Sequence, residues 1–479
     1  MISYSKRLTD LADADPQRPA ITCGGETVTR KELDLRSNRM AHHLAASGVG
    51  SGDMVTIALP NSVEWFVATV ACWKLGAVPQ PVSSRLPARE LESIIELAQA
   101  KVVLGPEPIV VPDDLDDSPL PDAVSPAWKA PTSGGSTGRP KLIVSGDPSL
   151  IDPDAPSPLL FQQDGVFVMP GPMYHNGPIV WSCGALLKGN HVVLLPRFDA
   201  EATLAAIHDH KADLIYLVPT MMKRILRLPE EVRARYDMSS LRWVWHLAEP
   251  CPVWLKEAWI EWLGPERIIE LYAGTEGQAA TVIVGTEWLE HRGSVGRPIH
   301  GQILILDAEG NELPPGAEGE VWMRSGRETP TYRYIGAEAR SRDGGWESLG
   351  DMGWVDKDGY LYLGDRMQDM VLSGGANIYP AEVESAIQEH PCVHSVAVVG
   401  LPDEDLGNRL HAIVEADEEA IDERELRSFL AERLVTYKIP RSFEFVDEPL
   451  RDDAGKVRRT QLRAERAGAA PTGTPPVSS

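Results

Sequence analysis

Basic residues, cysteines and long apolar runs are all scarce in this chain of 479 residues. Lys and Arg number 46 against 70 Asp and Glu, for a net charge of −24, whereas proteins that bind nucleic acids or anionic membranes present basic surfaces. The five cysteines lie far apart, without a CxxC pair or clustered histidines, which argues against a zinc site or a disulfide framework. No apolar run approaches the roughly 18 residues of a membrane span, and none follows the N-terminus as in a signal peptide. We therefore expect a soluble, cytoplasmic protein that does not bind nucleic acid.

Strand-length and helix-length apolar segments alternate along the first half of the chain. They include helices at 31–47 and 63–75 and strands at 54–59, 166–169, 192–195 and 214–218. Asn61 stands where an N-cap for the second helix is expected. Such alternation predicts an α/β fold with a largely parallel sheet.

A different order of elements begins near residue 364. Pro380 is suited to open a helix because its missing N–H costs nothing there, and Asp422 with Glu425 fits a capping box for another. With the flanking apolar segments the order is β-α-β-β-α-β, typical of a small α+β domain. We predict a domain of residues 1–367, a second of residues 368–463 and a disordered tail of residues 464–479.

The sharpest motif is the glycine-rich segment 133–141, SGGSTGRPK. Glycines let backbone N–H groups approach an anion, the hydroxyls add donors and Lys141 adds charge. It is not a Walker A loop, because Gly138 is not followed directly by Lys-Ser or Lys-Thr. A flexible linker would also be rich in Gly and Ser, but it has no use for the closing Arg-Pro-Lys. The segment therefore predicts a phosphate-binding loop.

Further motifs follow in order: PMYHNG at 172–177, LYAGTE at 271–276, SLGD at 348–351, a segment from 365 to 384, and DAGKVRR at 453–459. Taken singly, His175, Asp351 or Lys456 would be an ordinary buried, turn or surface residue. Together and in this order the motifs resemble the adenylate-forming superfamily: acyl- and aryl-CoA synthetases, peptide-synthetase adenylation domains and beetle luciferases. The resemblance extends from about Asp10 to Leu462. It implies a large multi-subdomain N-terminal α/β region with a small mobile α+β C-terminal domain.

The resemblance implies an ATP site. The β- and γ-phosphates would be held by the loop residues Ser133, Gly134, Gly135, Ser136, Thr137, Gly138 and Lys141. Tyr272 would stack on adenine, with Gly274 in the same nucleotide site. Thr275 would hydrogen-bond a phosphate. Glu276 would help to hold Mg²⁺, a hard ion that prefers oxygen ligands.

The implied reaction joins two anions, because a carboxylate must attack the α-phosphorus of ATP. Positioning and charge stabilisation therefore dominate its catalysis. Asp351 would accept the ribose hydroxyls, and Arg366 would contact ribose or phosphate. Lys456 would bridge the carboxylate and the α-phosphate, a role that suits a compact charge on a flexible stem. His175 would gate the acyl site.

The same resemblance implies a lid that serves two half-reactions. After adenylation the small domain would rotate about Gln368, and Gly374 with Gly375 would line the tunnel for the thiol arm of coenzyme A. The sequence departs from the family pattern at this hinge, which is usually Asp or Lys. It also has Gly134 where Ser is usual and Ala273 where Gly is usual.

Several residues bear on the substrates. Asn176 stands where amino-acid-activating domains usually have an Asp for the α-amine, which disfavours an amino acid. Arg85 matches an Arg that contacts CoA phosphate in some aryl-CoA ligases. The segments 245–259 and 293–296 look like those of a bacterial subgroup with bile-acid and terpenoid CoA ligases. Small and apolar side chains would form the acid pocket: Gly177, Trp181, Tyr216, Met221, Ala248 and Gly277, with Asn176.

These features favour an AMP-forming acid–thiol ligase that converts a bulky or polycyclic, terpenoid or steroid-like carboxylic acid through acyl-AMP to acyl-CoA. ATP, Mg²⁺ and coenzyme A would take part. Transfer to a carrier protein, transfer to another acceptor such as an amine, and a non-catalytic nucleotide-binding role stay open. A homodimer also stays open.

Overall fold

The computed structural model describes residues 1–106, 111, 115–134, 140–366, 369–373, 376–403, 405–416, 421–451 and 457–467. They form two compact units. The first comprises Met1–Leu304, Trp322–Leu349 and Lys357–Leu361, and the second Ile305–Val321, Gly350–Asp356 and the chain from Tyr362. The predicted α/β class, with a large N-terminal and a small C-terminal part, is confirmed. The predicted boundary at residues 367 and 368, like most of the predicted tail, lies outside the described residues.

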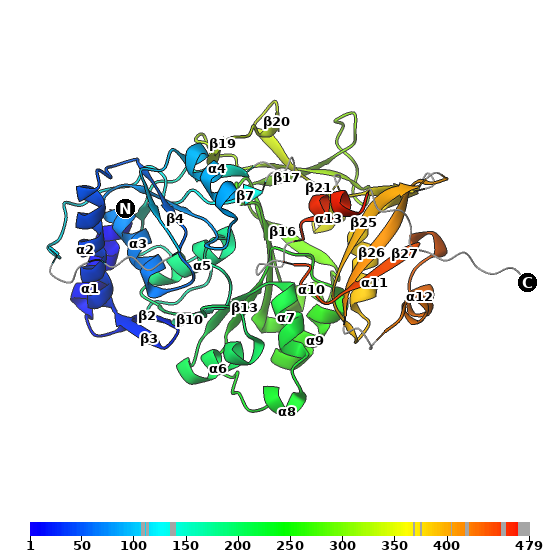
Figure 1. Ribbon diagram of the computed structural model, residues 1–479, viewed down its shortest axis with the longest axis horizontal. Coiled ribbons are helices and arrows are strands. Elements are labelled where there is room, and N and C mark those ends of the chain that lie inside the picture. The colour runs from blue at the N-terminus through cyan, green and yellow to red at the C-terminus, as the bar shows by residue number, and fades with distance from the viewer. Residues whose placement is uncertain are drawn as a thin grey trace, which may run out of the picture. The chain divides into compact units, whose positions relative to one another are not determined.

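The first unit is built on a mostly parallel sheet (Figure 1). Its strands run, in spatial order, β3 (Glu26–Thr29), β2 (Pro19–Cys23), β11 (His191–Leu194), β10 (Val166–Met169), β12 (Leu214–Leu217), β13 (Trp243–His246), β14 (Ile268–Ala273), β15 (Ala280–Val284) and β16 (Ser294–His300). Strands β2 through β14 are parallel, and β3, β15 and β16 pair antiparallel with their neighbours. Strand β12 is buried along its whole length, and its sequence is accordingly a continuous apolar run.

Helices connect and flank these strands: α1 (Tyr4–Ala14), α2 (Arg30–Ala46), α3 (Val63–Lys74), α5 (Asn176–Leu187), α6 (Ala200–His210), α7 (Pro219–Leu226), α8 (Glu230–Arg233), α9 (Val253–Leu263), η1 (Pro265–Arg267) and α10 (Gly285–Trp288). Figure 1 shows α1, α2 and α3 together. Helix α2 opens with a capping box of Thr29 and Glu32. The N-cap of α3 is Ser62, which accepts from the N–H of Trp65, so the expectation that Asn61 caps this helix is wrong.

Asn61 instead joins two loops at the C-terminal edge of the sheet. Its amide group donates to the carbonyl oxygens of Gly171 and Leu195, both at 2.9 Å, and accepts from the N–H of Met173 at 2.9 Å. These contacts fix the start of the 172–177 motif, which follows β10 and leads into α5.

Smaller sheets complete the first unit. Strands β5 (Val78–Pro81), β4 (Met54–Ile57) and β6 (Val102–Leu104) form a parallel sheet. Helix α4 (Ala88–Ala98) lies between β5 and β6 along the chain and contacts β4. Strands β19 (Tyr332–Ile335), β8 (Pro140–Ser145) and β7 (Thr132–Gly134) form an antiparallel one. A short pair joins β1 (Ile2–Ser3) to β9 (Leu150–Ile151). Strand β20 (Arg340–Arg342) pairs with the long strand β21 (Trp346–Val355).

Four strands contribute residues to both units: β17 (Gln302–Leu306), β18 (Gly319–Arg324), β21 and β22 (Leu361–Arg366). The rest of the second unit is β23 (Val371–Ser373), β24 (Ala376–Ile378), α11 (Pro380–Gln388), β25 (Val393–Asp403), β26 (Gly407–Ala416), α12 (Glu423–Ala431), η2 (Thr436–Lys438), β27 (Ser442–Val446) and α13 (Arg459–Arg466). Strand β26 pairs antiparallel with β25 and parallel with β27. The predicted β-α-β-β-α-β order is present, with β24 and α13 as additions.

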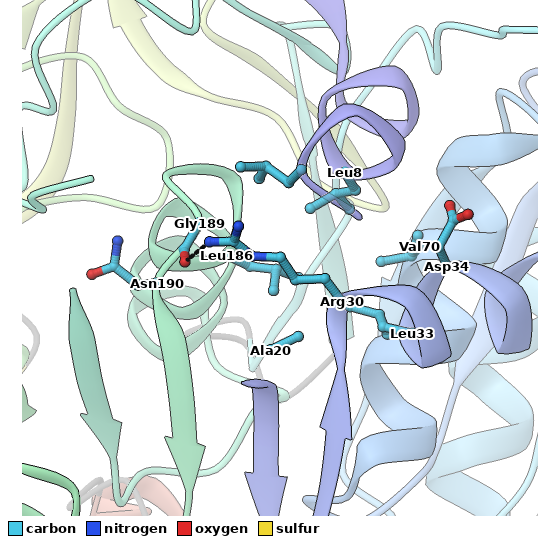
Figure 2. A pocket seen from close by; sticks show the side chains of 10 residues that line it. Leu8, Ala20, Arg30, Leu33, Asp34, Val70, Leu186, Gly189 and Asn190 are labelled. Carbon is cyan, nitrogen blue, oxygen red and sulfur yellow. Dashed lines mark hydrogen bonds between the residues drawn. The ribbon is translucent and has the colours of Figure 1, made fainter. Parts of the chain in front are cut away.

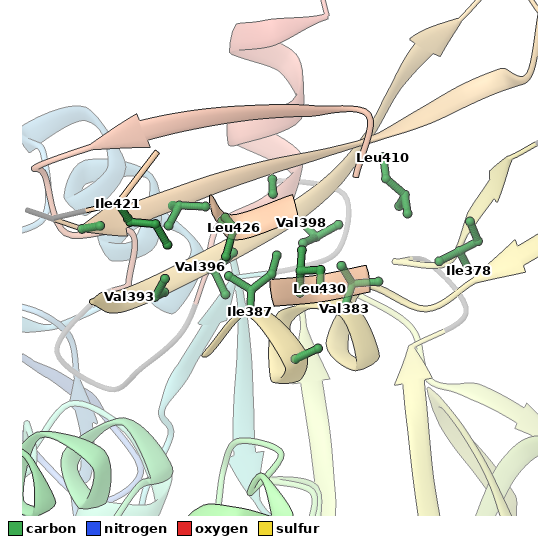
Figure 3. Packing of buried hydrophobic residues seen from close by; sticks show 14 of the residues in the cluster. Ile378, Val383, Ile387, Val393, Val396, Val398, Leu410, Ile421, Leu426 and Leu430 are labelled. Atoms are coloured by element: carbon green, nitrogen blue, oxygen red, sulfur yellow. The ribbon is translucent and has the colours of Figure 1, made fainter. Parts of the chain in front are cut away.

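The second unit has its own hydrophobic core. Figure 3 shows Val383 and Ile387 of α11 beside Val396 and Val398 of β25, with Leu430 of α12. The N-cap of α12 is Asp422, whose carboxylate accepts from the N–H of Glu425 at 2.7 Å. Within the described residues, no helix is long and apolar enough to cross a membrane.

Candidate functional site

The ends of the predicted phosphate loop belong to an antiparallel pair of strands. Ser133 in β7 is paired with Lys141 in β8, and Gly134 with Pro140. The pairing brings both ends of the loop together, so that Lys141 stands beside the first loop residue. The central residues Gly135, Ser136, Thr137 and Gly138 lie outside the described residues.

Lys141 meets Glu276, although the two come from motifs far apart in the sequence. The ammonium nitrogen of Lys141 is 3.6 Å from Oε1 of Glu276. It also lies 3.9 Å from the ring centroid of Tyr334, whose hydroxyl donates a hydrogen bond to the same carboxylate. The Glu276 side chain is 7% exposed and that of Lys141 20%. A buried carboxylate, a cation and a phenol thus converge next to the phosphate loop.

Tyr334 reaches this group because β19 lies along β8. The register pairs Tyr334 with Ile143, two residues from Lys141. Burial and the neighbouring Glu276 raise the pKa of the Tyr334 phenol, which keeps it a hydrogen-bond donor. Sequence reasoning missed Tyr334 because it belongs to none of the motifs.

A second hydrogen-bond group supports the first. Tyr332 is on the same face of β19 as Tyr334, with ring centroids 4.7 Å apart. Its hydroxyl donates to Oε2 of Glu347 at 2.8 Å, and the amide of Gln278 donates to the same oxygen at 2.9 Å. These contacts fix β19 against the segment that follows Glu276.

Gly274 leaves the space that the Glu276 carboxylate uses. A Cβ at Gly274 would lie under 3.0 Å from Leu349 and 3.1 Å from Oε2 of Glu276. Tyr272 precedes it on β14, opposite Thr281 of β15. The side chains of Tyr272 and Thr275 are both partly exposed, so the 271–276 motif offers accessible groups around one buried carboxylate.

The predicted acid pocket contains a cluster of buried aromatic residues. Trp181 of α5 makes edge contacts with Tyr216 of β12 and Trp245 of β13, with ring centroids 5.4 and 5.7 Å apart. Trp181, Tyr216 and Met221 are at most 3% exposed. A Cβ at Gly177 would lie under 3.0 Å from the Tyr216 hydroxyl. The missing side chain of Gly177 therefore makes room for Tyr216.

Helix α5 begins at Asn176, and His175 is its N-cap residue. The His175 ring lies 4.4 Å from that of Tyr174. Ala248 is exposed and has φ +74°, a strained value for a residue with a Cβ. Gly277 has φ +71°, and a Cβ there would have its nearest contact at 3.8 Å, so some open space remains beside it.

The remaining predicted positions belong to several elements. Arg85 is exposed in the segment between β5 and α4. Asp351, on β21 in the second unit, is 8% exposed, and Arg366 ends β22, where only its backbone is described. The hinge and lid residues lie outside the described residues: Gln368, Gly374, Gly375 and Lys456.

The described residues outside this region offer a small cavity and no candidate metal cluster. Among the described residues, no group of three or more His, Cys, Asp or Glu could hold a metal ion. The cavity in Figure 2, lined by residues including Leu8, Arg30 and Asn190, has a volume of about 10 Å³, room for about one water. The Arg30 guanidinium bridges it by donating to the carbonyl of Gly189 at 2.6 Å.

Comparison with known proteins gives the family. The sequence model described as AMP-binding enzyme matches residues 8–333, and that of the AMP-binding enzyme C-terminal domain matches residues 382–456. A fatty acid–[acyl-carrier-protein] ligase, ScoC of Streptomyces coeruleorubidus, is 31% identical over 94% of this chain and 94% of its own. A feruloyl-CoA synthase of Amycolatopsis sp is 32% identical over 94% of this chain and 96% of its own.

The fold gives the same answer. The o-succinylbenzoate CoA synthetase (MenE) of Bacillus subtilis, in complex with its acyl-adenylate intermediate, superposes with a TM-score of 0.80 at 27% identity, covering 98% of this chain and 99% of MenE. These matches confirm the predicted family and the predicted enzyme class, an AMP-forming acid ligase of the acyl-CoA synthetase type. The chain belongs to the AMP-binding enzyme family.

Proposed function

We propose that the chain activates a bulky, largely apolar carboxylic acid with ATP and transfers the acyl group to the thiol of coenzyme A. The observation that carries this proposal is the convergence of Lys141, Glu276 and Tyr334 at the end of the phosphate loop. A cation beside a glycine-rich loop suits the β- and γ-phosphates. One buried carboxylate suits Mg²⁺, which keeps water and phosphate oxygens as its other ligands.

The reaction would proceed in two displacements. A carboxylate oxygen of the acid attacks the α-phosphorus, the bond from that phosphorus to the bridging oxygen breaks, and pyrophosphate leaves. The thiol sulfur then bonds to the acyl carbon, the bond from that carbon to AMP breaks, and the thiol proton passes to solvent. In this scheme Thr275 binds a phosphate, Tyr272 stacks on adenine, Asp351 holds the ribose, and Arg366 contacts ribose or phosphate. Lys456 neutralises the two anions only in the first step.

Coenzyme A as acceptor is supported by the exposed cation Arg85 and by the similarity to a feruloyl-CoA synthase and an o-succinylbenzoate CoA synthetase. A diglycine at 374–375 suits a tunnel for a narrow thiol arm. ATP and coenzyme A as substrates favour a cytoplasmic location.

A bulky acid is supported by the aromatic and apolar lining of the predicted pocket. Trp181, Tyr216 and Met221 would offer flat and flexible apolar walls. The missing side chain of Gly277 leaves open space next to that residue. A terpenoid or steroid-like acid fits this combination.

A carrier protein is the second candidate acceptor, because ScoC, at 31% identity, acts on an acyl-carrier protein. Both acceptors present the same phosphopantetheine thiol chemistry. They differ in the surface that would surround the thiol entrance.

The full chain, incubated with ATP, Mg²⁺, coenzyme A and a panel of fatty, aryl, bile-type and diterpenoid acids, tests the proposal by mass spectrometry of the products. An acyl-CoA of a bulky acid is expected. Acyl-AMP without acyl-CoA would favour the carrier protein, and preferred turnover of short fatty acids or simple benzoates would overturn the bulky acid. Lys141→Met should abolish product, whereas Lys211→Met, at a lysine whose side chain is 58% exposed, should not.

A further inference from the structure

Lys129 is a buried lysine beside the predicted acid pocket. Its backbone is fixed between two segments, since the N–H of Ser145 donates to the Lys129 carbonyl at 3.0 Å and the N–H of Ala130 donates to Pro79 at 3.0 Å. The residue is 7% exposed. Its ammonium donates a hydrogen bond to Oδ1 of Asn176 and lies 4.9 Å from the Trp128 ring centroid.

The positive charge of Lys129 has no carboxylate partner within 4 Å in the described part of the chain. Two other buried lysines have one: Lys74 is 2.8 Å from Asp34, and Lys256 is 2.6 Å from Glu270. A buried ammonium needs such compensation, because removing it from water is costly. Burial accordingly lowers the pKa of Lys129 to about 8, against the more distant Glu276, which raises it.

Water cannot supply the missing partner from within the crevice that borders Lys129. This crevice, lined by residues including Trp65, Trp73, Trp128 and Ile179, leaves no volume for a water molecule. Within the described residues, one amide oxygen accepts from an ammonium that has three N–H donors. The charge is satisfied only in part by the protein itself.

Unpartnered donors recur in the neighbouring aromatic cluster. The indole nitrogens of Trp181 and Trp245 are buried and make no hydrogen bond to any residue that the structure describes. Trp181 is on α5, the helix that Asn176 opens. A ligand seated beside these two indoles would satisfy them with oxygen acceptors.

We propose that Lys129 and Asn176 form a specificity site for a second anionic oxygen group, such as a carboxylate, on the acid substrate. The inference rests on the proposed function, since it assigns this group to the acid that is activated. Because Oδ1 of Asn176 faces Lys129, the amide directs its N–H donors elsewhere, as an oxygen acceptor requires. The N-terminal end of α5, a helix of 12 residues, adds positive potential at the same place. The positive charge of Lys129 would repel the α-ammonium group of an amino acid, so amino acids are rejected.

Matched acids test this site. Benzoate is compared with phthalate, and 3-phenylpropanoate with phenylsuccinate and with phenylalanine. Binding to the full chain is measured by calorimetry with a non-hydrolysable ATP analogue, and pyrophosphate release is measured with ATP. The diacid should bind at least about tenfold more tightly than its monoacid, the effect of one hydrogen bond to a charged group, and phenylalanine should not bind.

The variants Lys129→Met and Lys129→Gln should lose this preference, so that each diacid binds no more tightly than its monoacid. Lys188→Met removes a cation that donates to the carbonyls of Pro153 and Ala155, and this variant should keep the preference. Equal binding of both members of each pair to the wild type would overturn the inference without any variant, and so would a preference retained in both Lys129 variants. Diacids that bind without pyrophosphate release would contradict the proposed function and leave this site standing.

Discussion

The phenol of Tyr334 donates a hydrogen bond to the carboxylate of Glu276, and its ring lies 3.9 Å from the ammonium of Lys141. One side chain therefore contacts both charged groups assigned to the phosphates and Mg²⁺. Its strand, β19, is paired with the strand that carries Lys141. We infer that Tyr334 is a positioning residue, which keeps the Glu276 carboxylate aimed at the end of the phosphate loop.

Replacing Tyr334 by Phe should weaken adenylation while leaving the fold intact. The variant keeps the ring against Lys141 but removes a hydrogen bond to a carboxylate, an interaction of about 1.5–3 kcal/mol. We expect the rate of ATP–pyrophosphate exchange to fall by roughly 10- to 100-fold, with a rise in the Mg²⁺ concentration needed for half-maximal exchange.

Tyr332→Phe is the matched control. It removes a hydrogen bond of the same kind, to Glu347, on the same face of the same strand. A purely structural role for β19 would make both variants behave alike, whereas only Tyr334→Phe should change the Mg²⁺ dependence. An unchanged Mg²⁺ dependence in Tyr334→Phe would contradict the positioning role.

Gly274→Ala should displace the Glu276 carboxylate. The added methyl would lie under 3.0 Å from Leu349 and 3.1 Å from Oε2 of Glu276, closer than most real contacts. Exchange should fall at least about tenfold, since small misplacements in such sites cost large factors. The double variant Gly274→Ala with Leu349→Ala provides room for the methyl and should recover part of the activity. No recovery would mean that the glycine is needed for another reason.

Gly177→Ala should destabilise the first unit because the methyl would collide with the hydroxyl of Tyr216. Overpacking of this kind costs about 1–3 kcal/mol, which urea unfolding would measure. Gly105→Ala is the control, because a Cβ there meets nothing within 4 Å and the residue does not have a positive φ. Equal stability of the two variants would show that Tyr216 moves aside at no cost.

Local patterns in the sequence predicted many of the helices and strands, but not which distant residues their side chains contact. The strand at 166–169 and the cap at Asp422 appear as expected, because both depend on neighbours along the chain. The assignment of an N-cap to Asn61 failed, since Ser62 also can cap and Asn61 is used to join the loops at Gly171 and Leu195. Periodicity cannot tell which of two adjacent polar residues caps a helix when one of them bonds to a distant loop.

The candidate site divides in the same way. Lys141 and Glu276 were proposed from their motifs, and the structure brings their side chains together. Tyr334 and Lys129 lie outside every motif, and a tyrosine or lysine carries no sequence signal of which charge it will face. The only available sign was the Tyr-Arg-Tyr alternation at 332–334, typical of a strand with one aromatic face.

Replacing Lys129 by Met should raise the free energy of unfolding above that of the wild type near neutral pH, and this gain should shrink in alkali. Burial lowers the pKa of Lys129 from 10.5 to about 8, so the folded chain loses this proton before the unfolded chain does. The penalty for the buried charge is therefore complete below pH 8, declines between pH 8 and 10.5, and is absent above. Its full size is roughly 3 kcal/mol, at 1.36 kcal/mol for each pKa unit.

Urea unfolding of both proteins at pH 7, 9 and 10.5 measures the difference between their free energies of unfolding. The titration of groups that both proteins share cancels in this difference. The advantage of the variant in free energy of unfolding should shrink as the pH rises. A difference that stays constant would mean that Lys129 keeps an ordinary pKa in the folded protein, and hence that its charge is already compensated.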